Sequence, residues 1–205
     1  MTKQITITTV GRTRTYVPHY LQITEEHYGY FEQAMADIVI MDKSGTKISH
    51  ELRYAQFSHG QIVIVFTWMC LESLAYDYAA MHFSDTYVQK YLEKLPTLSK
   101  LVLIPQLVTG KRFPTDGQAY QYLDELKTSR NELVHYKSGP AAKTEDDNKR
   151  SANIVRENVD DFPQKVRHAS KCVARYADAV IKMHGDKDHF LDLLLELTTK
   201  RSKSK

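Results

Sequence analysis

Apolar residues recur every three or four positions along most of this chain, which is the spacing that places them on one face of an α-helix. The strongest pattern begins at Ser49, a residue type that caps helices, and runs to about Phe83. From Ile62 to Leu74 this segment is apolar on nearly every side, which predicts a central buried helix. Gly60 is a candidate position for a bend in it.

Shorter helices are predicted between the N-terminus and the middle of the chain. Thr24 can cap a helix over 25–41, and Ser84 can cap another over 84–95. A further short helix, over 97–104, lies between two prolines.

The second half of the chain continues the helical pattern. A connection over 106–116 leads into a helix over 117–137. The polar stretch 138–153, which carries charges of both signs, predicts an exposed loop. Two more helices are expected over 159–184, with a proline near the first turn, and over 187–199.

The N-terminal residues break this pattern. Residues 4–17 alternate β-branched side chains around Gly11, which predicts a short hairpin. The fold expected from these patterns is an all-α helical bundle with a short N-terminal extension. We therefore divide the chain into an extension over 1–48 (hairpin plus helix), a bundle over 49–199 and a basic disordered tail over 200–205.

Composition narrows the class of protein. With only 8 glycines and 6 prolines in 205 residues, a sandwich or barrel with many tight turns is not expected. The net charge of +3 permits a nucleic-acid partner without implying one. Cys70 and Cys172 lie far apart, so neither a disulfide framework nor a cysteine-based zinc site is predicted.

The two isolated cysteines and the N-terminal sequence predict a cytoplasmic protein. The N-terminal residues have no apolar core of the kind found in a signal peptide. Glu72 and Asp77 interrupt the apolar run over 62–80, so we expect a core helix there and no membrane span.

Polar chemistry gathers at the end of the helix predicted over 117–137. Asn131 and His135 are four residues apart and share a helix face, and the long side chain of Arg130 can reach the same end. An imidazole can take a proton from a ribose 2′-OH or give one to a leaving oxygen, while a guanidinium stabilises charge on phosphate. Such a group can cleave RNA without metal, although the spacing alone also fits a helix end held by hydrogen bonds.

The stretch 130–135, Arg-Asn-Glu-Leu-Val-His, resembles the Arg-x(4–6)-His motif of HEPN domains in its common form Arg-Asn-x-x-x-His. The context is similar as well, because an apolar helix leads into the motif in the second half of a helical domain. The resemblance covers residues 50–184. The apolar helix over 68–77 looks like the preceding core helix of that family, and Glu72 would be its inward polar residue, a partner for Arg130 or for another core group.

The resemblance implies an activity and an assembly. HEPN proteins are helical bundles, and many dimerise so that two Arg/His motifs form one composite active site. Many are metal-independent endoribonucleases of toxin–antitoxin or phage-defence systems that leave 2′,3′-cyclic phosphate ends. Carried over, Arg130 and His135 would be catalytic and Asn131 would support them. RNA, a second copy of the chain and an antitoxin or defence-system protein would be the partners.

Side chains around the motif extend this hypothesis. Lys127 and Lys137 could steer phosphates, and Tyr136 could stack on a base. Solvated charge and core packing are the structural alternatives for these three residues.

Other functions stay open. The histidines outside the motif lack the spacing of metal ligands, so no metal or cofactor is expected. A catalytically silent HEPN-like dimerisation or interaction module is the main alternative. A nucleotide-binding domain without hydrolysis is a further one.

Overall fold

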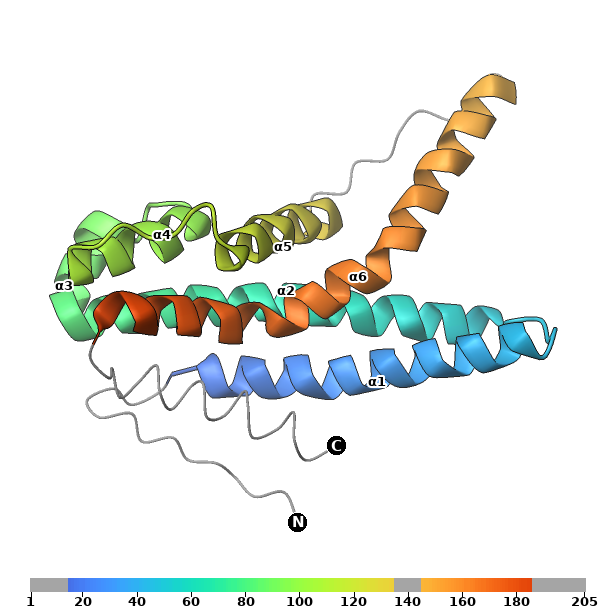
Figure 1. Ribbon diagram of the computed structural model, residues 1–205, viewed down its shortest axis with the longest axis horizontal. Helices are drawn as coiled ribbons and strands as arrows, with labels where there is room; N and C mark the ends of the chain where they lie inside the picture. Colours follow the sequence, from blue (N-terminus) through green and yellow to red (C-terminus); the bar gives the residue numbers. More distant parts are fainter. Residues whose placement is uncertain (1–14, 135–144, 186–205) are drawn as a thin grey trace, which may run out of the picture.

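The computed structural model of the chain describes residues 15–134 and 145–185, with side chains described in all of these except 145–160 (Figure 1). These residues form helices, turns and short connections, with no strand among them, which confirms the all-α class. Most of the predicted hairpin and all of the predicted helix over 187–199 lie outside this part of the chain. Val17, placed at the end of the hairpin by the sequence pattern, is helical.

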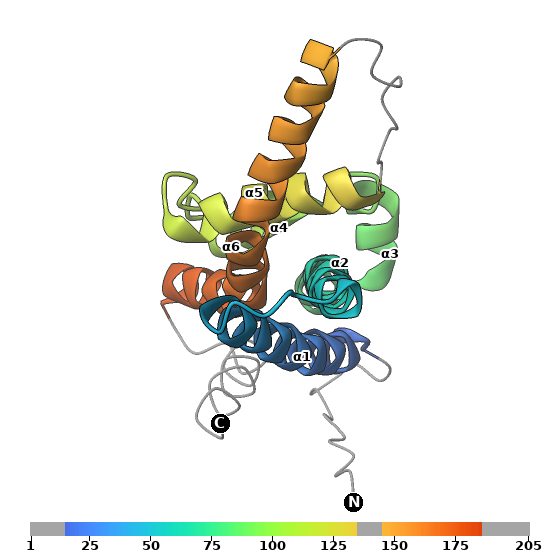
Figure 2. The ribbon, with the colours of Figure 1, turned by 90° about the vertical axis from the view of Figure 1, so that its right-hand side faces the viewer.

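Two long helices, α1 (Val17–Lys43) and α2 (His50–Phe83), lie antiparallel and side by side (Figures 1 and 2). Helix α2 begins as predicted, because the Ser49 hydroxyl accepts a hydrogen bond from the Leu52 backbone N–H at 3.2 Å. Helix α1 begins at Val17, so the prediction that Thr24 caps it is wrong. A proline in the first turn is compatible with the earlier start, and Thr24 is a buried residue of the helix interior.

The prediction of a central helix is confirmed, because α2 packs against α1, α4, α5 and α6. Its largest fully buried side chains include Ile64, Leu71, Leu74 and Tyr78. By length and composition α2 could cross a membrane, but 61% of its most apolar window is buried inside the structure. That burial is typical of the core helix of a soluble protein.

The helix predicted over 84–95 is divided in two. Ser84 has φ 78°, a rare value for a residue other than glycine, and it changes the direction of the chain. A single turn, α3 (Asp85–Tyr87), is followed by a π-helical turn, η1 (Val88–Leu92). The Ser84 side chain makes no capping hydrogen bond to α3, contrary to the prediction.

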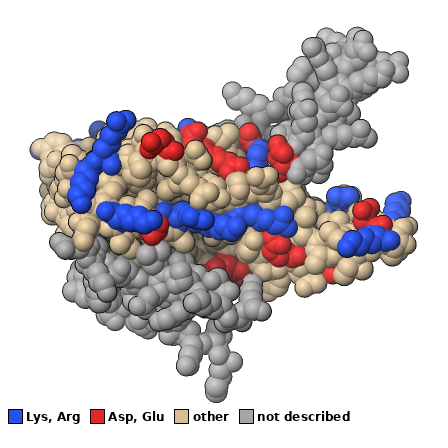
Figure 3. All heavy atoms as spheres, viewed as in Figure 1, with Lys and Arg blue, Asp and Glu red and all other residues tan. Residues whose placement is uncertain are grey.

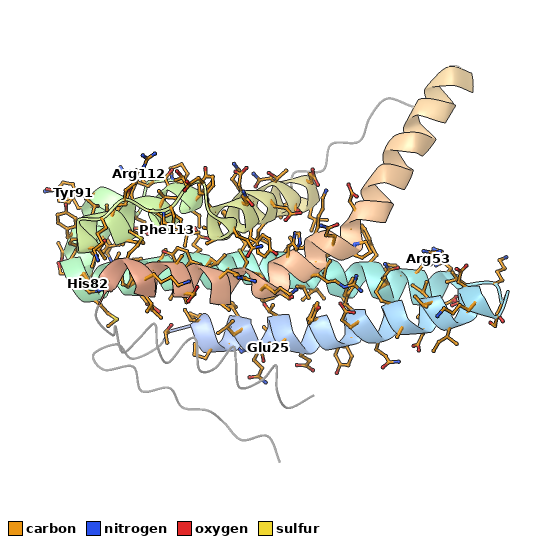
Figure 4. All side chains as sticks on the ribbon, viewed as in Figure 1. Glu25, Arg53, His82, Tyr91, Arg112 and Phe113 are labelled. Atoms are coloured by element: carbon orange, nitrogen blue, oxygen red, sulfur yellow. The ribbon has the colours of Figure 1, made fainter. Side chains whose placement is uncertain are left out.

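The next helix, α4 (Thr97–Thr109), continues through Pro105, which was expected to end it. Its end is set by Gly110, which has the left-handed φ of 68° and donates its N–H to the carbonyl of Gln106 at 2.9 Å. In the connection that follows, Phe113 points into the core while Arg112 points outward (Figure 4).

In the described part of the chain, the last two helices are α5 (Gln118–Val134) and α6 (Glu145–His184). Helix α6 begins at Glu145, so the prediction of a loop is wrong for residues 145–153. Its first part projects from the bundle, and its second part packs against α2 and α5 (Figures 1 and 2). Pro163 was expected near the first turn but lies inside the helix, where it removes a backbone hydrogen bond and favours the change of direction.

Candidate functional site

The second half of α5 positions the residues of the predicted motif. Leu123, Leu126 and Ser129 are 0%, 2% and 4% exposed and form the inner side of this helix. Their burial against α2 and α6 fixes the rotation of α5 about its axis. Asn131 is consequently exposed, and Arg130 is partly buried beside the inner side.

Arg130 and Asn131 are in contact. Nη1 of Arg130 donates a hydrogen bond to Oδ1 of Asn131 at 3.1 Å. Among the residues described, no carboxylate forms an ion pair with Arg130, so its guanidinium can take an anionic ligand. His135, Tyr136 and Lys137 lie outside the described part of the chain, so their roles stay predictions.

Ion pairs flank the two motif residues. Lys127 bonds to Asp124 at 2.8 Å within α5, and both side chains are well exposed. Glu132 accepts a hydrogen bond from Lys165 of α6 at 3.2 Å. The pair of Lys165 and Glu132 joins the end of α5 to α6. The pair of Lys127 and Asp124 lies within α5, and phosphate steering and solvated charge both stay predictions for Lys127.

Glu72 does not point inward as the resemblance implied. It is exposed on α2 and accepts a hydrogen bond from the Thr97 hydroxyl of α4 at 2.9 Å. Leu71 and Leu74 face the core, so the position one residue after Leu71 is rotated outward. The inward carboxylate of this helix is Asp77, which is 7% exposed and accepts a hydrogen bond from the Thr15 hydroxyl.

A histidine–carboxylate pair lies between α5 and α6. Nδ1 of His168 is 2.6 Å from Oε2 of Glu125, and the Tyr122 ring stacks on the imidazole with centroids 4.4 Å apart. Because an ionised carboxylate can only accept, Nδ1 carries the proton of this bond. The pair was missed in the sequence because its members are 43 residues apart and no local motif links them.

The two cysteine thiols and many candidate metal ligands lie among the residues whose side chains the structure describes, 15–134 and 161–185. In that part of the chain, no group of three histidine, cysteine or acidic side chains is arranged to hold a metal ion. Cys70 and Cys172 are buried and unpaired, and burial raises the pKa of both thiols. Both are therefore protonated at neutral pH and poorly reactive.

Comparison with known proteins adds no further likeness. The chain matches no family model, and no curated protein or solved structure matches it either. The resemblance to the HEPN family therefore rests on the sequence pattern described above and stays a prediction.

Proposed function

We propose that this protein is a metal-independent endoribonuclease of HEPN type that acts on RNA in the cytoplasm. One observation carries the proposal: the Arg130 guanidinium lies at the end of α5, bonded to the Asn131 carboxamide. Its remaining N–H groups can bind phosphate oxygens. In the sequence His135 follows Asn131 by four residues, the spacing of the motif.

The proposed reaction uses the 2′-OH of the substrate as the nucleophile. His135 takes the 2′-OH proton, and the resulting oxygen attacks the adjacent phosphorus. The bond from phosphorus to the 5′ oxygen breaks, and an imidazolium gives that oxygen a proton. The products are a 2′,3′-cyclic phosphate and a 5′-OH. Arg130 stabilises the charge on the non-bridging oxygens, and Asn131 orients the guanidinium.

A homodimer supplies what one subunit lacks. The reaction needs one base and one acid, and each chain carries a single motif histidine. Two motifs in one composite cleft provide both. His135 of one subunit can start neutral and act as the base, while His135 of the other starts protonated and acts as the acid. A nuclease of this kind requires control in the cell, which supports an antitoxin or a defence-system protein as a partner.

A catalytically silent HEPN-like dimerisation module is the second candidate. The same bond supports it, because a hydrogen bond between Arg130 and Asn131 can stabilise the end of α5 without any catalytic role. The two candidates differ in whether RNA is cut.

Product analysis tests the proposal. Purified protein is incubated in EDTA with an RNA, with the DNA of the same sequence and with a fully 2′-O-methylated RNA. We expect cleavage of the unmodified RNA alone, with 2′,3′-cyclic phosphate and 5′-OH ends. Products ending in 3′-OH, or cleavage of the DNA, would exclude attack by the 2′-OH, and intact RNA throughout would favour the silent module.

A further inference from the structure

Four exposed basic side chains follow one face of the second part of α6: Arg167, Lys171, Arg175 and Lys182. They are spaced by four, four and seven residues, which keeps them on one side of a helix. We call them the basic row. Figure 3 shows lysine and arginine side chains aligned across this face of the molecule.

Carboxylates neutralise only part of the row. Arg167 donates two hydrogen bonds to Glu32 of α1, at 2.9 and 3.2 Å. Lys182 bonds to Asp178 at 2.8 Å. Lys171 and Arg175 form no ion pair with any residue that the structure describes. The face thus carries two paired cations and two cations available to a ligand.

The basic row lowers the pKa of a neighbouring carboxylate, Glu32. This pKa is lowered first by the hydrogen bond from Arg167, and the charges of Arg167 and Lys171 lower it further. Positive charge at both positions therefore already stabilises an anion beside α6.

The basic row begins close, along α6, to the residue that contacts the helix carrying the candidate site. Lys165 lies on α6 just before Arg167 and bonds to Glu132 of α5 at 3.2 Å. Glu132 is two residues from Arg130. Because α5 and α6 pack together, the row starts on α6 two residues after the position that contacts the end of α5.

We propose that the basic row binds the sugar–phosphate backbone of the RNA strand as it leaves the candidate site. The inference rests on the proposed function and assigns the path of its substrate. Four residues of helix rise about 6 Å, so the two members without an ion pair among the described residues, Lys171 and Arg175, present cations at that spacing along the helix to successive phosphates. Contacts of this kind position a strand without reading its sequence. An acidic protein partner could use the same charges, but RNA is the ligand that the proposed function already brings to this protein.

The test measures RNA binding separately from cleavage. A fluorescently labelled single-stranded RNA is titrated at several salt concentrations with the His135→Ala protein, which leaves the probe intact. The same titration is repeated after adding Lys171→Gln and Arg175→Gln to that protein. Because each phosphate contact contributes about 0.7 to the slope of log K against log salt for single strands, the slope should become shallower by about 1.4.

Lys43→Gln with Lys47→Gln is the matched control. Both lysines are exposed, one at the end of α1 and one in the connection to α2, and their replacement removes the same charge. The control should keep the slope of the parent. An unchanged slope in the row variant, an equal change in the control, or no RNA binding by the parent would overturn the proposal.

The experiment distinguishes failure of the binding path from failure of the nuclease function. If wild-type protein cuts no RNA but the row variant lowers the slope as expected, the binding path is supported and the nuclease function fails. If the wild type cuts RNA and the slope stays unchanged, the nuclease function stands and the binding path is overturned.

Discussion

The edge of the Phe162 ring lies against the backbone of Gly60, so that a Cβ added at Gly60 would sit 2.6 Å from two ring carbons. Gly60 is buried in α2, and Phe162 comes from α6. The absence of a side chain at this position therefore allows the close approach of the two helices.

Gly60→Ala should destabilise the protein. Alanine is favoured over glycine inside a helix by about 1 kcal/mol, but overpacking a core costs about 1–3 kcal/mol. The contact falls on a ring held between helices, so we expect a net loss of about 1–2 kcal/mol in urea unfolding. In a Phe162→Leu protein, which lacks the ring, Gly60→Ala should cost less stability than it costs in the wild type. A Gly60→Ala protein as stable as the wild type would show that the helices separate without cost.

A pair of histidines between α1 and α2 predicts a dependence of stability on pH. Nδ1 of His27 and Nδ1 of His59 are 2.8 Å apart, and Tyr30 contacts both rings. The bond requires one nitrogen with a proton and one without. Burial, and then the charge of His27, lower the pKa of His59 below its usual 6.5. The Tyr30 hydroxyl also donates a hydrogen bond to the Glu26 carboxylate at 3.3 Å.

A depressed histidine pKa means that the unfolded chain binds the proton more readily. The stabilisation is fully present above about pH 6.5 and is lost as the pH falls through the folded pKa. We expect the free energy of unfolding to decrease between pH 7 and pH 5, and to decrease less in His59→Gln. Urea unfolding at pH 7, 6 and 5 measures this. Parallel curves for the two proteins would show that His59 does not contribute.

The bond between Glu125 and His168 predicts an energetic coupling between α5 and α6. Its length is 2.6 Å and its side chains are 34% and 24% exposed, so solvent screens part of the attraction. A double-mutant cycle with Glu125→Ala and His168→Ala should give a coupling of about 0.5–1 kcal/mol. Nitrogen NMR should show the proton on Nδ1 of His168 in the wild type and a changed signal in Glu125→Ala. Additive unfolding energies together with an unchanged signal would contradict the bond.

Periodicity predicted the helices whose ends carry a local signal. Ser49 marks the start of α2 because its hydroxyl caps the first turn. Helix α6 was predicted to start too late because residues 145–153 are strongly polar, a composition that favours a loop but also suits a helix projecting into solvent. In α4, Gly110 rather than Pro105 determines the end, and the sequence offers both signals.

Side-chain partners depend on contacts that the order of residues does not contain. Arg130 and Asn131 are neighbours in the sequence and share a hydrogen bond, while their joint role toward RNA stays a prediction. The rotation of α2 places Glu72 outward, and that rotation is set by packing against four other helices. Glu125 and His168 meet only because α5 and α6 pack together, so no local pattern predicts them.

Cleavage of RNA in EDTA by wild type, Arg130→Ala and His135→Ala tests the central claim most directly. Arg53→Ala and His50→Ala are matched controls, since both residues are exposed near the start of α2 (Arg53 is labelled in Figure 4). Loss of a general acid or base costs about 10²–10⁴ in rate, so His135→Ala should be slower by at least about 10²-fold, with Arg130→Ala similarly impaired and both controls active. Cleavage by His135→Ala at the wild-type rate would contradict the proposed mechanism.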